Sequence, residues 1–334
     1  MSSNESPSPK PKSPPIFGPV LLSFVLYLLL FFVIWGIFGK PLPFWGAILL
    51  YVTCTLLVSS FQQRHQKKET PKILQNLPGS GPVGRLPDLV LGFTFSLSAI
   101  LAIFNPFQFT QMIRQLAGQA AITKRLRDLP TPETYSQQVR YTLPFSGQWL
   151  VINGGTTPQN SHSWDILTQR YAYDFVITDD ERRRHSENGT RLEDYYCYDQ
   201  PILAVADGEV IKVSDGVRNA PLVGYGMADF LARDFRGNFV VIHHAPNEYS
   251  FSAHLIPGRI QVQEGQRITR GQVIGYGGHS GHSTEPHLHF HIQDHPDFFL
   301  GMGLPVKFEN VSVDGEPQNE ALYLQAGMFV QPPS

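Results

Sequence analysis

Residues 278–291 read GHSGHSTEPHLHFH, and the structure of the surrounding region can be inferred outward from this stretch. Leu288 and Phe290 alternate with His287 and His289, a pattern typical of a half-buried strand. Because residues i and i+2 of a strand project to the same face, both imidazoles face away from the apolar side. Two adjacent neutral imidazoles are ligands suited to zinc. For an isolated H-x-H pair, the alternative is two surface histidines on an amphipathic strand.

The residues before this pair make the pattern more specific. The whole stretch resembles the closing motif of the lysostaphin/LytM-type zinc metallopeptidases, G-x-[ST]-G-x-S-T-G-P-H-L-H-F-E, whose members cut the peptide part of peptidoglycan. The chain differs from that motif at Glu285, where glycine is usual, and at His291, where glutamate is usual. Neither difference removes a central histidine. A weaker resemblance extends back to about Leu143.

Composition and charge exclude some other classes. Charged residues make up 16% of the chain and the formal net charge is −2, so nothing indicates nucleic acid as a partner. The two cysteines, Cys54 and Cys197, lie far apart in sequence and offer neither a disulfide framework nor a cysteine-based metal site.

The first third of the chain is apolar and predicts a membrane anchor. Residues 1–15 form a polar tail that we expect to be disordered, and residues 16–106 form a transmembrane region. Three apolar runs within it, 16–38, 43–61 and 89–104, are taken as transmembrane helices, since about 20 apolar residues cross a bilayer. A cleaved signal peptide is the alternative for the first run, which is long and lacks a small-x-small cleavage site.

The distribution of lysine and arginine suggests the topology. The loop 62–88 and the tail with Lys10 and Lys12 are basic, so both should be cytoplasmic with two spans between them. If 89–104 also crosses, the rest of the chain lies outside; if not, it is cytoplasmic. We expect three spans, hence a multi-pass cell-membrane protein with an extracytoplasmic C-terminal domain. Residues 107–142 are a juxtamembrane helix or linker. Its basic residues would then lie outside the cell, against the positive-inside rule that places lysine and arginine in the cytoplasm.

From residue 143 to residue 334, short β-type runs separated by glycine, asparagine and aspartate predict an all-β domain. The runs are Trp149–Ile152, Tyr171–Ile177, Ile202–Val205, Glu209–Val213, Phe239–His243, Tyr249–His254, Arg259–Val262 and Gln272–Tyr276. The segments AVADGEVI (204–211) and GQRITRGQVIG (265–275) resemble two further segments of the same peptidase family. The resemblance implies an antiparallel β-sandwich with a groove across one sheet.

The resemblance also implies which residues carry the chemistry. His254, in the sequence SFSAHL, matches a family element in which the histidine is catalytic but is not a metal ligand. The family's first motif, H-x-x-x-D, supplies a histidine ligand and an aspartate ligand. Here Asp174 is retained, but Arg170 occupies the position of the histidine. A guanidinium cannot ligate zinc because it stays protonated and has no lone pair to give.

The nearest upstream imidazole that could replace the missing ligand is His162, in the sequence NSHS. A divergent branch associated with this family has an N-x-H element well before a Q-R-Y-A-x-D-F run, and this chain resembles that branch. Asp165 is an alternative carboxylate, but it is not on a β-run. We therefore predict that Zn²⁺ is held by His162, Asp174 and His289.

His287 and His254 are then predicted to be catalytic, as the general base and the donor to the oxyanion. Which residue has which role stays open. The predicted function is a membrane-anchored zinc metalloendopeptidase acting on peptidoglycan peptides, with the cleaved bond undetermined because the family includes glycyl-glycine and stem-peptide cleavers. One alternative is a metal-free relative that binds wall peptides or activates another hydrolase. Another is an unrelated β-barrel metal protein such as a cupin, which does not explain the sequence STEPHLHF or His254.

Overall fold

The computed structural model describes residues 18–43, 46–47, 50–51, 53–54, 57–58, 71–84 and 86–333. The chain divides into two compact units, Met1–Gln62 and Gln63–Ser334. The first unit contains α1 (Gly18–Phe38), in which Tyr27 makes an edge-on ring contact with Tyr51. The expected tail 1–15, the basic segment 62–70 and much of the expected second span 43–61 lie outside the described residues.

The described residues contain no single helix that is both long and apolar enough to cross a membrane, and Val25–Phe38 is apolar but short. The expected third span, 89–104, is α4 (Asp88–Ile103), a helix of 16 residues. Its length of about 24 Å is less than the hydrocarbon thickness of a bilayer, roughly 30 Å. It is followed by α5 (Pro106–Arg125), and the axes of the two helices differ by 96°. Taken together, the two helices have the length and apolar composition of a membrane span, but neither has both alone. The expectation of three separate spanning helices is therefore not supported.

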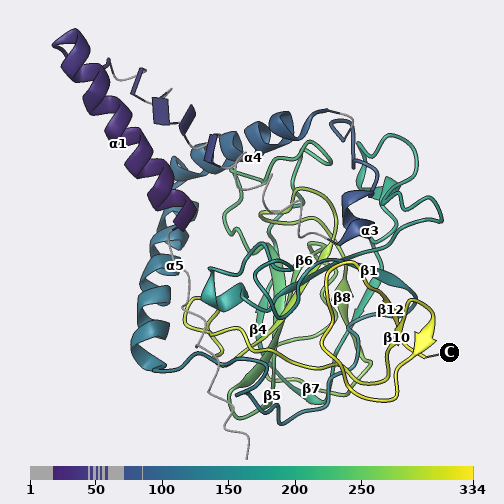
Figure 1. The fold of residues 1–334 in the computed structure, drawn as a ribbon. Helices are drawn as coiled ribbons and strands as arrows, with labels where there is room; N and C mark the ends of the chain where they lie inside the picture. The colour runs from purple at the N-terminus through teal and green to yellow at the C-terminus, as the bar shows by residue number, and fades with distance from the viewer. Residues whose placement is uncertain are drawn as a thin grey trace, which may run out of the picture. The chain divides into compact units, whose positions relative to one another are not determined.

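The second unit contains the predicted all-β domain (Figure 1). Its strands are β1 (Trp149–Asn153), β2 (Tyr173–Val176), β3 (Pro201–Leu203), β4 (Gly208–Ser214), β5 (Asn238–Ala245), β6 (Glu248–Leu255), β7 (Arg267–Ile268), β8 (Val273–Tyr276), β9 (Leu288–Gln293), β10 (Ser312–Val313), β11 (Glu316–Pro317) and β12 (Phe329–Gln331). Short helices are α3 (Lys72–Gln75), η1 (Leu167–Gln169) and η2 (Leu192–Asp194). The run expected at Arg259–Val262 is not a strand.

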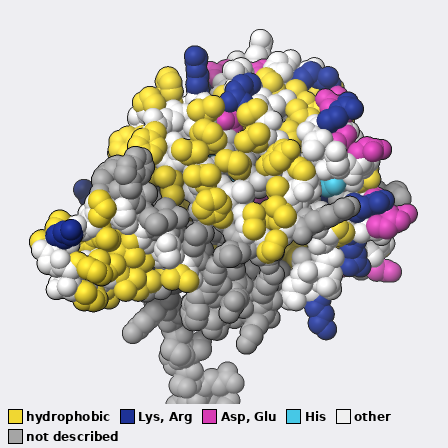
Figure 2. All heavy atoms as spheres, turned by 90° about the horizontal axis from the view of Figure 1, so that it is seen from above, with side chains coloured by type: hydrophobic (Ala, Val, Ile, Leu, Met, Phe, Trp, Pro, Cys, Tyr) yellow, Lys and Arg dark blue, Asp and Glu magenta, His cyan; other side chains and the backbone are white. Residues whose placement is uncertain are grey.

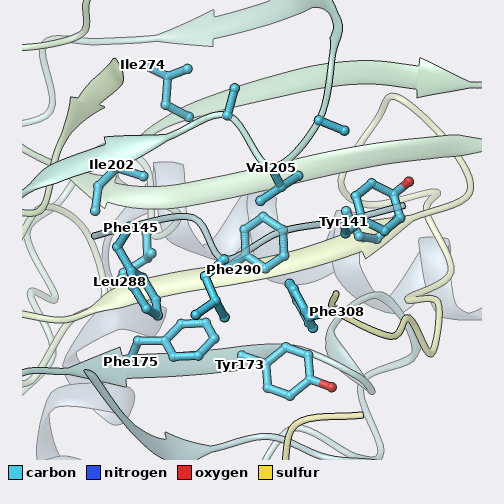
Figure 3. Packing of buried hydrophobic residues seen from close by; sticks show 14 of the residues in the cluster. Tyr141, Phe145, Tyr173, Phe175, Ile202, Val205, Ile274, Leu288, Phe290 and Phe308 are labelled. Carbon is cyan, nitrogen blue, oxygen red and sulfur yellow. The ribbon is translucent and has the colours of Figure 1, made fainter. Parts of the chain in front are cut away.

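Among the described residues, ten strands form one antiparallel sheet in the order β11-β10-β12-β1-β2-β9-β6-β5-β4-β7, and β3 pairs with β8 in a second sheet. The main core includes residues of both sheets. Leu288 and Phe290 of β9 belong to the same buried cluster as Phe175 of β2, Ile202 of β3 and Ile274 of β8 (Figure 3). Burial of these apolar side chains is the main force holding the sheets together. The predicted antiparallel all-β fold is confirmed.

The strand register positions the predicted site residues. In the antiparallel pair β2–β9, Asp174 lies opposite His289, and Phe175 lies opposite Leu288. Directly opposed residues point to the same face of a sheet, so Asp174 and His289 face each other on one side while their apolar neighbours fill the core. The strand alternation read from residues 278–291 therefore places the imidazole of His289 away from the core, as predicted.

The segment after α5 is anchored to the sheet by one buried glutamate. The carboxylate of Glu248, at the start of β6, is fully buried and accepts hydrogen bonds from Tyr135 Oη (2.5 Å), Gln138 N (2.6 Å) and Tyr141 Oη (2.6 Å). Burial, together with the hydrogen bonds to this carboxylate, raises the pKa of both tyrosines, so they remain protonated donors. Residues 135–141 are thus packed against the domain, with Tyr141 in its core, rather than a free linker.

Replacing Glu248 by glutamine is expected to lower the free energy of unfolding of the domain by about 1–3 kcal/mol. The side-chain NH2 group that replaces one carboxylate oxygen cannot accept the hydrogen bond that a tyrosine hydroxyl donates there. Thermal unfolding followed by circular dichroism measures the change. Glu316→Gln is the matched control, since Glu316 is exposed on β11 and its loss should change stability by less than about 0.5 kcal/mol. Equal melting temperatures of the two variants would contradict the anchoring role.

Candidate active site

A cavity of about 660 Å³ lies over the face of the sheet that carries the predicted site residues. One side is lined by the polar residues Asn153, His162, Asp174, His254, His282, Glu285, His287 and His289. The other side is lined by apolar residues of α4 and α5, namely Phe95, Ala99, Ala102, Ile103, Phe109, Met112 and Leu116. All five predicted site residues therefore meet in one cleft.

Asp174 is at the centre of the polar side. Its Oδ1 lies 2.8 Å from His289 Nδ1, and its Oδ2 accepts a hydrogen bond of 3.1 Å from Asn153 Nδ2. Burial alone would raise the pKa of this carboxyl group, but the bond to His289 and the neighbouring imidazoles outweigh burial and hold the pKa well below its usual value. Asp174 is therefore ionised and can act as a ligand.

His162 reaches the same carboxylate from the loop after β1. Its Nδ1 lies 3.8 Å from Asp174 Oδ2, and its backbone N–H donates to Asn153 Oδ1 over 2.8 Å. Asn153 thus holds both the loop of His162 and the carboxylate of Asp174. The sequence analysis missed Asn153, because its role follows from the pairing of β1 with β2, which sets it opposite Asp174.

A chain of hydrogen bonds along β9 fixes the tautomer of His289. The amide nitrogen of Gln293 donates to the carbonyl of His295, so its Oε1 accepts from His291 Nε2 over 2.9 Å. His291 Nδ1 then accepts from His289 Nε2 over 3.2 Å. Burial, with the adjacent imidazole of His289, lowers the pKa of His291 to about 3, so this ring is neutral. The same contact with His291 turns the ring so that His289 Nδ1 is directed at Asp174 Oδ1, 2.8 Å away.

His287 and His254 both keep one ring nitrogen free for the cleft. His287 Nδ1 donates to the carbonyl of Glu285 (2.8 Å), which leaves Nε2 bare at 3.8 Å from Asp174 Oδ1. His254 Nδ1 donates to the carbonyl of Ser280 (2.7 Å), and its ring centroid lies 4.8 Å from that of His287. Burial and the two neighbouring imidazoles hold the pKa of His254 well below its usual value. Both rings are therefore placed to accept or return a proton.

The backbone of His254 is in the left-handed region, with φ of 62°. Such a conformation costs a non-glycine residue about 1–3 kcal/mol and persists only where the surroundings hold it in place. Here the bond to Ser280 and the antiparallel neighbour β9 hold the residue at the end of β6. The strain supports a functional rather than an incidental position for this imidazole.

The two departures from the family motif now have structural explanations. Glu285, in place of glycine, accepts a hydrogen bond of 2.8 Å from Arg184, so the charged segment after β2 is fastened to the turn before β9. His291, in place of glutamate, is the neighbour that orients His289. Neither role could be inferred from the motif, because each depends on a partner distant in sequence or on the order of hydrogen bonds.

Arg170 is not part of the cleft. It follows η1 rather than lying on β2, its Nε donates to the carbonyl of Trp164 over 3.1 Å, and its guanidinium lies 5.1 Å from the Trp164 ring centroid. Arg170 therefore does not take the place of the missing histidine near Asp174, because the turn before β2 directs its side chain onto Trp164. Asp165, the alternative carboxylate, also lies outside the cleft lining.

The donor atoms around Asp174 suit a zinc ion. No group of three or more His, Cys, Asp or Glu side chains in the described part of the chain is already placed to hold a metal. However, ligand atoms of a tetrahedral zinc lie roughly 3.3 Å apart, and the contacts of Asp174 with His289, His162 and His287, at 2.8, 3.8 and 3.8 Å, bracket that value. Asp174, His289 and His162 are therefore close enough for a small shift of their side chains to bring them around one zinc ion.

Comparisons with known proteins indicate the family of this region. Residues 188–299 match the model of Peptidase family M23. Peptidoglycan DD-endopeptidase ShyA of Vibrio cholerae serotype O1 is 41% identical over 155 residues, which cover 43% of this chain and 31% of ShyA. Peptidoglycan DD-endopeptidase ShyB of the same organism is 34% identical over 92 residues, covering 28% of this chain and 17% of ShyB.

Among solved structures, a zinc-containing peptidase from Vibrio cholerae is 23% identical, with a TM-score of 0.30, and the match covers 50% of this chain and 41% of that one. The chain spans less than a third of the length of the curated relatives it matches. The matched residues 188–299 include His254, His287 and His289, the part of the cleft on which the sequence resemblance rested. Residues 188–299 of this chain therefore carry a match to Peptidase family M23, in agreement with the family that the histidine motif indicates.

Proposed function

We propose that this chain is a membrane-anchored zinc metalloendopeptidase that hydrolyses peptide bonds in peptidoglycan, with its C-terminal domain outside the cytoplasm. The observation that carries the proposal is the position of His289, whose Nδ1 lies 2.8 Å from the ionised Asp174. Two imidazoles, His289 and His162, and one carboxylate in a single cleft form a donor set for a cation, bordered by two further imidazoles. The peptidoglycan endopeptidases among the relatives suggest the substrate class.

In this site, Asp174, His289 and His162 would hold Zn²⁺, which when bound polarises a carbonyl and lowers the pKa of water toward about 7. The bare Nε2 of His287 and of His254 can take the proton of the attacking water and return it to the leaving amine. To donate to the oxygen of the tetrahedral intermediate, the imidazole not used as the base must first carry a proton on Nε2. The apolar side of the cleft excludes water from these groups.

The proposal is tested on the purified full-length chain by its zinc content and by peptide release from purified peptidoglycan. The wild-type chain should hold one zinc and release peptides, and chelation should stop the release. His162→Ala should lose zinc, because two protein ligands are few for a tightly bound catalytic zinc. His243→Ala, which changes an imidazole stacked on Tyr249, is the matched control and should keep zinc.

The outcomes separate the proposal from its main alternative. A wild-type chain without zinc that still binds peptidoglycan would favour a metal-free relative that binds wall peptides or activates another hydrolase. A His162→Ala chain that keeps one zinc would leave the enzyme proposal intact and would remove His162 from the ligand set.

The proposed location makes a separate prediction. Protease added to intact spheroplasts should digest the domain after residue 130, since this domain would lie outside the membrane. A cytoplasmic marker protein measured in the same sample should survive until the cells are lysed. Protection of the domain until lysis would contradict the extracytoplasmic location and, with it, access to peptidoglycan.

A further inference from the structure

Helix α5 is attached to the catalytic domain by its polar side. Four glutamines at helical spacing make these contacts: Gln108, Gln111, Gln115 and Gln119. Gln119, for example, donates to the carbonyl of Asp165 over 2.8 Å and accepts from Leu167 N over 2.6 Å. Gly118 lies so close to the backbone of Phe299 that a Cβ would be 1.8 Å from its carbonyl oxygen. This face of α5 is therefore closely docked.

The apolar residues of α5 lie on another face. Phe109, Met112, Ile113 and Leu116 are 38–47% exposed, although they recur at the spacing of a single helical stripe. In a helix that packs on a soluble domain, the apolar stripe is normally buried and the polar face is exposed. In α5 the polar face is the docked one, while Phe109, Met112 and Leu116 of the apolar stripe line the active-site cleft and Ile113 does not.

Helix α4 shows the same inversion. Ser98 is buried, and its Oγ accepts a hydrogen bond from Ala228 N over 3.2 Å. Phe93, Leu97 and Phe104 recur four and seven residues apart on the side away from Ser98, and they are 44%, 37% and 78% exposed. Both helices thus use polar groups to contact the domain and leave large apolar side chains uncovered.

We define the elbow patch as Phe93, Leu97, Phe104 and Ile113, which are exposed but do not line the active-site cleft. Figure 2 looks down on the side of the molecule where Figure 1 places α4, and hydrophobic side chains gather over that side. Large apolar side chains exposed together in this number are uncommon on soluble monomeric proteins and often mark a binding surface.

We propose that the elbow patch lies in the interfacial layer of a lipid bilayer, with α4 and α5 along the membrane surface rather than across it. This inference rests on the membrane association proposed above and specifies which part of the catalytic unit makes contact. The upstream helix α1 supports lipid as the occupant, since its apolar side chains from Val25 to Phe38 are themselves largely exposed and need a nonpolar environment.

Length and charge support the same occupant. α4 is too short to cross a bilayer alone, and the glutamine face of α5 is already used by protein contacts. α5 has no acidic residue, and exposed Lys124 and Arg127 lie at and just beyond its end. An interfacial helix with an apolar stripe and nearby cations is suited to anionic headgroups.

The test measures membrane depth with the full-length chain in vesicles of phosphatidylcholine and phosphatidylglycerol. A bimane label is placed on a cysteine introduced at Leu97, Phe104 or Ile113, and its fluorescence is quenched by lipids with a doxyl group at carbon 5 or carbon 12. Leu29→Cys in α1 is the reference for the bilayer interior, and Glu320→Cys, at an exposed position after β11, is the reference for water. The parent chain corrects for labelling at Cys54 and Cys197, which are buried.

The expected result is stronger quenching by the carbon-5 lipid than by the carbon-12 lipid at all three elbow positions, with the opposite order at Leu29 and none at Glu320. Stronger carbon-12 quenching at Leu97 would show a spanning helix and overturn the proposal. Quenching at Leu29 but not at the elbow would also overturn it, because protein or water would then cover the patch. If Leu29 is not quenched, both the inference and the proposed anchor fail, whereas the zinc and hydrolysis measurements stand independently.

Discussion

His289→Ala is expected to abolish both zinc binding and peptide release. The substitution removes one of three predicted ligands and breaks two contacts, the one to Asp174 at 2.8 Å and the one to His291 at 3.2 Å. Loss of a partner of a metal ligand commonly costs 10–100-fold in affinity, so loss of the ligand itself should exceed about 100-fold. Metal titration of the purified chain, monitored by elemental analysis, measures the effect.

His291→Ala is a second variant, for which a smaller loss of zinc affinity is expected. It leaves all predicted ligands in place but removes the acceptor that fixes the His289 tautomer, so zinc affinity should fall by about 10–100-fold. Thermal unfolding of both variants shows whether either loss reflects a damaged fold. Retention of one zinc per chain in folded His289→Ala would remove this residue from the ligand set.

His287→Ala should keep zinc but lose about 10²–10⁴-fold in the rate of hydrolysis, the range typical of a general acid–base residue. The reason is the orientation of the ring, which donates from Nδ1 to the carbonyl of Glu285 and leaves Nε2 free for a proton. His254→Ala should have a similar effect, because its ring is held in the same way by Ser280.

The comparison of zinc content with rate makes this assignment testable. A fall in rate with unchanged zinc places His287 and His254 in proton transfer. Zinc loss in either variant equal to that of His289→Ala would show that ligand and catalyst have been assigned the wrong way round.

The site was predictable where chemistry follows strand periodicity. The alternation of Leu288 and Phe290 with His287 and His289 was sufficient to separate a core face from a cleft face, and the structure confirms that separation. Asn153 and His291 were not predictable in the same way. Their contacts depend on which strands are neighbours and on which ring nitrogen carries a proton, and neither property is encoded by residue spacing.

The N-terminal region was harder to predict for a different reason. An apolar run of the length of α4 has the same composition whether it spans a bilayer, lies at its surface or packs in a core. The basic and apolar composition of α5 indicated a juxtamembrane segment, but its glutamines gave no sign that they would be the docking surface. Only the hydrogen bonds of Gln108, Gln111 and Gln119 identify which side faces the domain.

Docking of α5 along its length also limits how far the enzyme can work from its anchor. Gln108 bonds the domain near the start of the helix, and Arg125 pairs with Asp294 at its end, over 2.7 Å. If the elbow patch lies in the bilayer surface, the cleft cannot move away from the membrane, as it could if a flexible linker joined the catalytic domain to its anchor. With α4 and α5 along the membrane surface, as proposed, the cleft beside them would stay next to the bilayer, and cleavage would be confined to the innermost layer of the wall.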